Sequence, residues 1–417
     1  MGPSAVNMSK LYLIIQNWWF TKLPEEHTKI QRGDSVWQFI LRCFIHPVKR
    51  RVAKYYLIIL KRLFGLKVIA VTGSAGKTIT KEMIASILKQ DGRVVWSRAN
   101  IDPVYNIPST ILRCMPNTKY LVLEMGVEFL GEMDFYLWLV KPDVGVVTNI
   151  YYTHTQFLES FENVFDEKSK LVIALSKEGY AVLNREDKAT YKLTKKIKSK
   201  ILFFGDGGDV NASNVQLSTR GTNFKLIIKD RTYNVLIPQA GEQFVKNALA
   251  AVATGYVLGV KDDRLLKGLL DVKPEEHRMN IFKHSSGALI VDDSYNSNPL
   301  ALEKSLLAFK VLGKQRKKIA VLGDMLELGK YEDMFHKQIG INLSLYGINY
   351  LIGVGKASKV LVKEAEKKLG RENVFWVESY NKVYKVLFPL INKESAVLIK
   401  GSRSIKLDKV ADRLSRL

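Results

Sequence analysis

The sequence predicts an α/β protein with two units of mostly parallel sheet and a short, basic helical N-terminal region. Three observations support this fold class. From residue 68 onward, short apolar runs alternate with helix-like stretches, as in a parallel sheet covered on both faces. The alternation starts afresh near residue 281, and the opening residues lack it. We therefore expect three segments: residues 1–66, 67–280 and 281–417.

Composition fits a folded protein with an ample core. The chain has 417 residues, 47% of them hydrophobic, and a formal net charge of +23. Its two cysteines, Cys43 and Cys114, form neither a disulfide framework nor a CxxC metal pair, which fits a reducing compartment. The positive charge attracts anions such as nucleotides, nucleic acid or an acidic membrane face. No long Lys/Arg block, zinc finger or RNA-binding aromatic signature accompanies it, so we expect no nucleic-acid partner.

The N-terminal region holds two apolar stretches, neither of which suits a bilayer span. Residues 11–20 are too few for the roughly 20 that a span needs, and they lack a secretory cleavage site. Residues 35–66 carry a basic side chain every few positions, and we expect Pro47 to break them. Two interpretations stay open: an anchor in the plane of an anionic membrane surface, or a helical hairpin packed on the next domain. We expect a cytoplasmic protein, peripheral on the inner face of the membrane under the first interpretation.

The first unit opens with a strand, a glycine turn and a helix. Residues 68–71 are the apolar strand, and a helix-like stretch follows Lys77 and Thr78. Such a turn cradles phosphates, because glycines let the backbone approach an anion and N–H groups at the helix start point at it. We expect Lys77 to reach the terminal phosphates of a nucleotide and Thr78 to ligate Mg²⁺. The motif is a shortened P-loop, since Val71 stands where the full pattern has a glycine. Its residues are Gly73, Ser74, Ala75, Gly76, Lys77 and Thr78.

Polar residues follow the later strands of this unit. The predicted elements are parallel strands at 119–126, 143–150 and 179–184, appended antiparallel strands within 201–240, and a helix at 240–259. Glu124 ends one parallel strand, at the carboxyl edge where ligands bind, so we expect it to hold Mg²⁺ opposite Thr78. Asn149 and His154 follow the next strand and face the same crevice.

The second unit has five predicted strands with helical stretches between them. This pattern is doubly wound and Rossmann-like. No GxGxxG follows the first strand, so we expect no dinucleotide there. The strands lie at 287–293, 317–325, 350–355, 374–379 and 396–402.

The order of motifs along residues 67–417 resembles the Mur ligase family, most closely its D-alanyl-D-alanine-adding members. The motifs are TGSAGKT, LEMG, TNIYYTH, EKSKL, GEQFVKNALAA, HRMN, DDSYNSNP, LGDMLELG and KGSRS. DDSYNSNP followed by LGDMLELG is the most specific pair. Related ligases for other amino acids, and folylpolyglutamate synthases, have a His where this chain has Tyr295-Asn296.

The resemblance implies an ATP-dependent amide ligase of cell-wall precursor synthesis. A peptide or glycopeptide carboxylate attacks ATP to give an acyl phosphate, and the amine of D-alanyl-D-alanine or a similar short donor then displaces phosphate. Three alternatives stay open. One is a related ligase with another acceptor, of pseudomurein or polyamide type. Another is a membrane-associated binder of ATP without activity, and the third is a nucleic-acid-dependent ATPase, which only the charge favours.

The resemblance also implies roles for individual residues. Lys77, His154, Lys168 and Arg278 are the expected catalytic residues. Two Mg²⁺ ions are expected on Thr78, Glu124, His154 and a carbamylated Lys168. Asn247 is expected on the adenine side of the nucleotide, with Arg278 at the γ-phosphate and Asp293, Tyr295 and Asn296 closing over it. Expected substrate contacts are Asn149, Lys400, Ser402 and Arg403.

The chain departs from the family pattern in four places. Pro103-Val104 replaces an Asn-Glu pair that helps hold the glycopeptide, Gln243 replaces a histidine, and Lys170 replaces an acidic residue. The 66 residues before the P-loop also lack the pattern of the family's uridine-binding domain. We therefore hypothesise an acceptor that is lipid-linked or otherwise non-uridylated, presented at the membrane surface.

Overall fold

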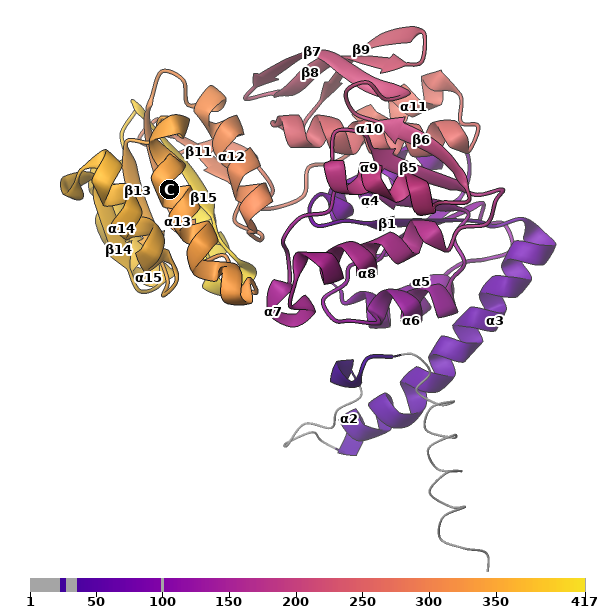
Figure 1. Ribbon diagram of the computed structural model, residues 1–417. Coiled ribbons are helices and arrows are strands. Elements are labelled where there is room, and N and C mark those ends of the chain that lie inside the picture. The colour runs from indigo at the N-terminus through magenta and orange to yellow at the C-terminus, as the bar shows by residue number, and fades with distance from the viewer. Residues whose placement is uncertain (1–22, 28–35, 99–100, 417) are drawn as a thin grey trace, which may run out of the picture.

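The computed structural model describes residues 23–27, 36–98 and 101–416 and shows two sheets (Figure 1). The first sheet has the strand order β2-β3-β1-β4-β5-β6-β7-β8-β9, and the second has the order β10-β11-β15-β12-β13-β14. We call each sheet with its helices the first and the second unit. Both sheets are mostly parallel, so the predicted fold class is confirmed.

In the first sheet, β2 to β7 pair in parallel and β7 to β9 form an antiparallel meander. The prediction that all strands of 201–240 are antiparallel is therefore wrong for β6. The helical segment between β5 and β6 returns the chain to the same end of the sheet, and a crossover of this kind makes parallel neighbours. The strands are β1 Lys67–Thr72, β2 Val94–Trp96, β3 Tyr120–Glu124, β4 Val144–Val147, β5 Tyr180–Asn184, β6 Lys200–Phe204, β7 Val210–Ser218, β8 Gly221–Ile228 and β9 Arg231–Ile237.

Alternating side chains of β1 face two different layers of helices. Ile69 and Val71 lie in the core cluster that includes α4 and α10, whereas Val68 and Ala70 lie in the cluster that includes α3, α5, α6 and α8. A strand buried on both faces needs such a continuous apolar run. The helices are α4 Lys77–Lys89, α5 Pro103–Ile111, α6 Glu132–Leu139, α7 Thr155–Leu158, α8 Phe161–Ile173, α9 Lys188–Lys192, η3 Leu193–Lys196, α10 Glu242–Val257 and α11 Asp262–Leu270.

The second sheet contains the five predicted strands as β11 to β15, and one more. The additional strand, β10, pairs antiparallel with β11 at the edge. Its strands are β10 Asn280–Lys283, β11 Leu289–Asp292, β12 Lys317–Gly323, β13 Tyr350–Val354, β14 Val374–Val377 and β15 Ser395–Lys400. Its helices are α12 Pro299–Leu312, η4 Gly329–Tyr331, α13 Glu332–Asn342, η5 Leu343–Tyr346, α14 Ser358–Leu369, η6 Arg371–Asn373, α15 Tyr380–Leu387, η7 Phe388–Leu390, η8 Arg403–Ile405 and α16 Asp408–Ser415.

The chain is helical without a break from Val36 to Phe64, so the expected interruption at Pro47 is wrong. Pro47 directly follows the π turn η2, whose wider turn accommodates a residue that has no N–H to donate. Before α3 come the 3₁₀ turn η1, the helix α2 and the π turn η2. The elements are η1 Glu25–His27, α2 Val36–Ile40, η2 Leu41–Ile45 and α3 His46–Phe64.

Helix α3 packs on the first unit through one side only. Ala53, Leu57 and Leu60 are buried in the same core cluster as α5 and α6, and Figure 1 shows the indigo helix beside both. Over the described part of the chain, no helix has the length and apolar character to cross a bilayer. The predicted apolar stretch 11–20 lies outside the described residues.

Candidate active site

Residues that directly follow β4 hold the phosphate loop, residues 73–78, through hydrogen bonds. The backbone N–H of Ser74 donates to the carbonyl of Asn149 at 3.0 Å, and that of Ala75 donates to Asn149 Oδ1 at 2.9 Å. Thr148 Oγ1 donates to the carbonyl of Ala75 at 2.7 Å. Asn149, predicted as a substrate contact, thus holds the loop. It also lines the cavity that lies between the two units. Thr148 was not predicted as a site residue.

Two glycines make this loop sterically possible. A Cβ at Gly73 would lie 2.0 Å from Thr148 Oγ1. Gly76 has φ 81°, and a Cβ there would lie 2.5 Å from Oδ1 of Asn247 on α10. Only glycine takes such a conformation without cost and leaves room for these neighbours. Asn247, predicted on the adenine side, therefore lies against the loop itself.

Lys77 and Thr78 begin α4 beside the end of β3. Nζ of Lys77 donates to the carbonyl of Gly73 at 3.0 Å, and Thr78 Oγ1 donates to Glu124 Oε1 at 3.1 Å. Burial lowers the pKa of Lys77; Arg278 lowers it further, and Glu124 opposes both. The expected convergence of Thr78 and Glu124 therefore exists in the structure.

Lys168 lies on α8 and does not line the cavity between the two units. The side chain is fully buried, and Nζ has no hydrogen-bond partner among the described residues. Burial lowers the pKa of this amine well below its usual range, and the nearby charge of Lys77 adds to the effect. In the described residues, no group of three His, Cys, Asp or Glu side chains is placed to hold a metal. A carboxylate added to Lys168 would supply an acidic ligand that these side chains do not.

His154 lies at the start of α7 and is paired with the second unit. Its Nδ1 lies 2.6 Å from Oε2 of Glu327. Glu327 belongs to LGDMLELG, but the sequence analysis gave it no role.

Arg278 reaches the phosphate loop from the segment that joins the two units. Its Nη2 donates to Thr78 Oγ1 at 3.4 Å, and its Nε is paired with Glu275 at 2.6 Å. The guanidinium carbon lies 4.1 Å from the ring centre of Tyr295. That of Arg403 lies 5.2 Å from the same ring, so Tyr295 contacts both arginines.

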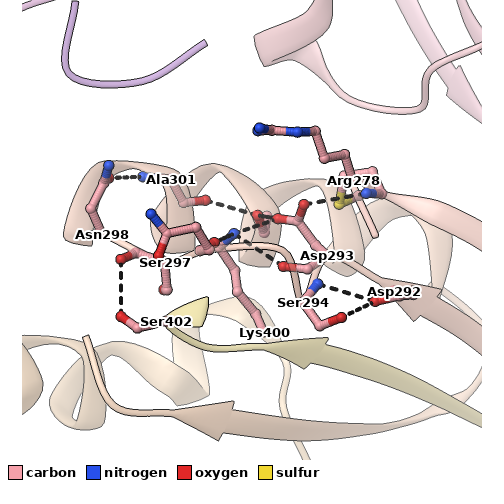
Figure 2. A network of polar contacts seen from close by, with 12 residues as sticks. Arg278, Asp292, Asp293, Ser294, Ser297, Asn298, Ala301, Lys400 and Ser402 are labelled. Carbon is pink, nitrogen blue, oxygen red and sulfur yellow. Dashed lines mark hydrogen bonds and ion pairs between the residues drawn. The ribbon is translucent and has the colours of Figure 1, made fainter. Parts of the chain in front are cut away.

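Residues after β11 form a polar network with Lys400 (Figure 2). Nζ of Lys400 lies 2.6 Å from Asp293 Oδ2 and donates to the carbonyl of Asn296 at 2.9 Å. Asn298 caps α12 and extends Nδ2 to the carbonyl of Ser74 at 3.3 Å. Sequence reasoning missed Asn298, although an Asn before the Pro that starts a helix is a recognisable cap. Ser402 accepts from the backbone of Leu326 at 2.9 Å.

A cavity of about 910 Å³ lies between the two units. Most predicted site residues line it. Gly73, Lys168, Ser402 and Arg403 do not. The predicted residues in its wall are Ser74, Ala75, Gly76, Lys77, Thr78, Glu124, Asn149, His154, Asn247, Arg278, Asp293, Tyr295, Asn296 and Lys400.

One part of the cavity wall contains acidic and aromatic residues that were not predicted from the sequence. Glu128, Glu132 and Tyr136 line it. Burial raises the pKa of Tyr136 well above its usual range, and its hydroxyl has no hydrogen-bond partner in the described residues. His27, from the N-terminal region, places Nε2 2.6 Å from Glu132 Oε1. Pro103, in the segment that departs from the family pattern, starts α5 at this wall.

Two family models match the chain. The Mur ligase middle domain matches residues 71–255, and the Mur ligase, glutamate ligase domain matches residues 277–403. The UDP-N-acetylmuramoyl-tripeptide--D-alanyl-D-alanine ligase of Bacillus subtilis is 32% identical over 391 residues, which are 94% of this chain and 82% of the relative. The Escherichia coli ligase of the same name is 28% identical over 353 residues, 84% of this chain and 76% of the relative.

Solved structures show the same similarity. MurF from Acinetobacter baumannii superposes with a TM-score of 0.81 at 28% identity, covering 89% of this chain and 81% of that one. MurF from Thermotoga maritima in complex with ADP has a TM-score of 0.79 at 24% identity, covering 93% of this chain and 87% of that one. The two chains share the fold.

Proposed function

Because the chain belongs to the Mur ligase family, we propose that it is an ATP-dependent peptide ligase of cell-wall precursor synthesis. It activates the carboxylate of a peptide or glycopeptide acceptor as an acyl phosphate. The amine of D-alanyl-D-alanine or a similar short donor then attacks the acyl carbon, an amide forms and phosphate leaves. The names of the Bacillus subtilis and Escherichia coli relatives support the donor, and the ADP bound to the Thermotoga maritima structure supports the nucleotide.

The observation that carries this proposal is the meeting of both units at the phosphate loop. Thr78 Oγ1 donates to Glu124 within the first unit and accepts from Arg278 in the joining segment. Asn298 of the second unit donates to the carbonyl of Ser74. In the reaction, the loop N–H groups and Lys77 bind the terminal phosphates, and Arg278 offsets charge that develops on the transferred phosphate. Closure of the two units excludes water and protects the acyl phosphate from hydrolysis.

The residues present fit two Mg²⁺ ions. Thr78 and Glu124 would hold one of them, and His154 and a carbamylated Lys168 would hold the other. Bound Mg²⁺ neutralises phosphate charge and orients the carboxylate for attack. The support for carbamylation is that Nζ of Lys168 is buried, has no hydrogen-bond partner in the described part of the chain and has a lowered pKa, since only the neutral amine adds to CO₂. In that addition an N–C bond forms and one proton leaves. Labelled bicarbonate would give a carbamate signal that Lys168→Ala lacks.

We propose that the chain divides as the sequence predicts, into residues 1–66, 67–280 and 281–417. The start of β1 at Lys67 and of β10 at Asn280 supports the two boundaries. The remaining expected site roles belong to the same proposal. These are Asn247 at the nucleotide, Asp293, Tyr295 and Asn296 closing over it, and Lys400, Ser402 and Arg403 on the side of the incoming amine.

We further propose that the protein is cytoplasmic and that α3 rests on an anionic membrane surface. Every fourth or third side chain along α3 forms one exposed apolar row, on the side opposite its buried residues. Residues 36–66 contain seven Lys or Arg and no Asp or Glu. Arg50 is buried and Lys61 is paired with Asp143, and the charge of the other five complements anionic lipid. Such docking suits an acceptor carried by a lipid. The row consists of Val48, Val52, Tyr55, Ile59 and Leu63.

The test of the ligase proposal is a phosphate-release assay with both substrates varied. The acceptors are a uridylated muramoyl tripeptide and a lipid-linked peptide, and the donors are D-alanyl-D-alanine and other short peptides. We expect phosphate release only when acceptor, donor and ATP are all present, and none with Lys77→Ala. Release without an amine, or stimulation by DNA or RNA alone, would overturn the proposal. The acceptor that supports turnover identifies the substrate class.

A further inference from the structure

His154 and Glu327 form a hydrogen bond that joins two segments 173 positions apart in the sequence. His154 Nδ1 and Glu327 Oε2 are 2.6 Å apart, which is short for a neutral hydrogen bond and typical of a charge-assisted one. Both residues have left-handed backbone conformations, φ 53° and 65°. Residues other than glycine rarely adopt these, so surrounding contacts must hold the backbone there.

The surrounding contacts fix the position of Glu327 relative to His154. The backbone N–H of Gln156 donates to the carbonyl of Glu327 at 3.0 Å, and Thr155 Oγ1 donates to the carbonyl of Leu328 at 2.9 Å. A Cβ on Gly329 would lie 3.0 Å from Cα of Gln156, so the two backbones are packed closely. The carboxylate is therefore held at the imidazole by its own backbone, independently of any ligand.

His154 and Glu327 differ in their relation to the cavity. His154 lines it, whereas Glu327 lies outside it with 44% of its side chain exposed. An imidazole that donates from Nδ1 has its lone pair on Nε2, which is the form that binds a metal. A carboxylate on the other ring nitrogen fixes that tautomer and ring orientation, and it raises the basicity of the ligand.

We propose that Glu327 is a positioning residue, supplied by the second unit, that holds His154 in the orientation and tautomer that bind a divalent cation in the cavity. This inference rests on the proposed role of His154 as a metal ligand. Glu327 does not touch the nucleotide or the cation. It acts through the imidazole, so the second unit contributes to the cation site of the first.

The test is calorimetric titration of Mn²⁺ into the full-length protein in the presence of ADP. We expect Glu327→Gln, which has the same shape but no charge, to weaken Mn²⁺ binding about 10-fold or more. Its melting temperature and its ADP affinity in EDTA should stay at wild-type values, which a structural role for Glu327 would not allow. Glu327→Asp, which keeps the charge, should recover part of the loss. Asp333→Asn, a change at an exposed carboxylate early in α13, is the matched control and should bind Mn²⁺ normally.

A His154→Ala protein separates the two ways in which the idea can fail. If His154→Ala weakens Mn²⁺ binding and Glu327→Gln does not, the inference about Glu327 is overturned while His154 remains a ligand. If neither change affects Mn²⁺ binding, His154 is not a ligand and both assignments fall. Ligase turnover of the wild-type protein tests the proposed function separately.

Discussion

Nη2 of Arg278 lies 3.4 Å from Oγ1 of Thr78, across 200 positions of sequence. Thr78 also donates to Glu124, so three parts of the chain meet at one hydroxyl. The Tyr295 ring beneath the guanidinium and the paired Glu275 carboxylate hold Arg278 in this position. A cation fixed in advance at the phosphate loop costs no reorganisation when charge develops during phosphoryl transfer.

Arg278→Ala should lower kcat by about 100- to 1,000-fold, because one donor to the transition state is removed. KM for ATP should rise much less, since the loop N–H groups and Lys77 remain. Steady-state phosphate release checks this. Arg371→Ala, in η6 on the exposed surface, is the matched control and should leave both constants unchanged. Turnover of Arg278→Ala at the wild-type rate would contradict the assignment.

Gly76→Ala should abolish nucleotide binding. The new Cβ would lie 2.5 Å from Asn247 Oδ1 in a left-handed backbone, so the loop has to move. Gly65→Ala is the matched control, because Gly65 is also left-handed (φ 68°) but has no atom within 4 Å of the added Cβ. We expect Gly65→Ala to cost about 1–2 kcal/mol of stability and to bind ADP normally. Equal ADP affinities for the two variants, measured by calorimetry, would show that the loop does not bind the nucleotide.

Asp293→Asn should destabilise the second unit by about 3–5 kcal/mol, because it leaves the buried ammonium of Lys400 without its carboxylate. Urea unfolding followed by circular dichroism measures the change. Glu378→Gln removes an exposed partner of Lys382 and should not shift the unfolding curve. Curves that coincide for Asp293→Asn and wild type would mean that the pair adds nothing to stability.

Cys114 should resist thiol reagents until the protein unfolds. Burial raises the pKa of this thiol to about 12, so almost no thiolate exists even under alkaline conditions, and the thiolate is the reactive form. In a Cys43→Ser background, labelling with a chromogenic disulfide should be slow in buffer and complete in guanidinium chloride. Within the pH range of the folded state the labelling rate should rise about tenfold per pH unit without reaching a plateau, because the thiolate stays a minor form below a pKa of about 12. Rapid labelling of the native protein would place Cys114 at the surface.

Anionic vesicles should bind the protein through the exposed row of α3. Flotation with phosphatidylglycerol vesicles should recover the wild-type protein at low salt, and recovery should fall as salt screens the basic residues. Tyr55→Glu with Leu63→Glu should abolish it. The control pair, Leu236→Glu with Leu345→Glu, changes two other exposed apolar residues away from α3 and should float normally. Flotation of both double variants alike would exclude α3 as the membrane surface.

Much of the architecture is readable from local sequence. Buried parallel strands need continuous apolar runs, and those at 68–71 and 119–126 became β1 and β3. The meeting of Thr78 and Glu124 was also predictable, since strand ends of a parallel sheet share one edge. The parallel pairing of β6 and the unbroken helix through Pro47 were not. The pairing of β6 depends on the route of the crossover from β5. The unbroken helix depends on a π turn that accommodates Pro47.

By itself, the sequence determined the two parallel sheets, the phosphate loop and the family, because apolar periodicity, glycine placement and motif order are local properties. Only the tertiary structure decided which side chains complete the cavity. Three features depend on how the two units and their helices pack. They are the hydrogen bond between Glu327 and His154, that between Asn298 and Ser74, and the complete burial of Lys168. Residues far apart in the chain carry no local signal of their contact, since the contact arises only when the elements between them have folded and docked.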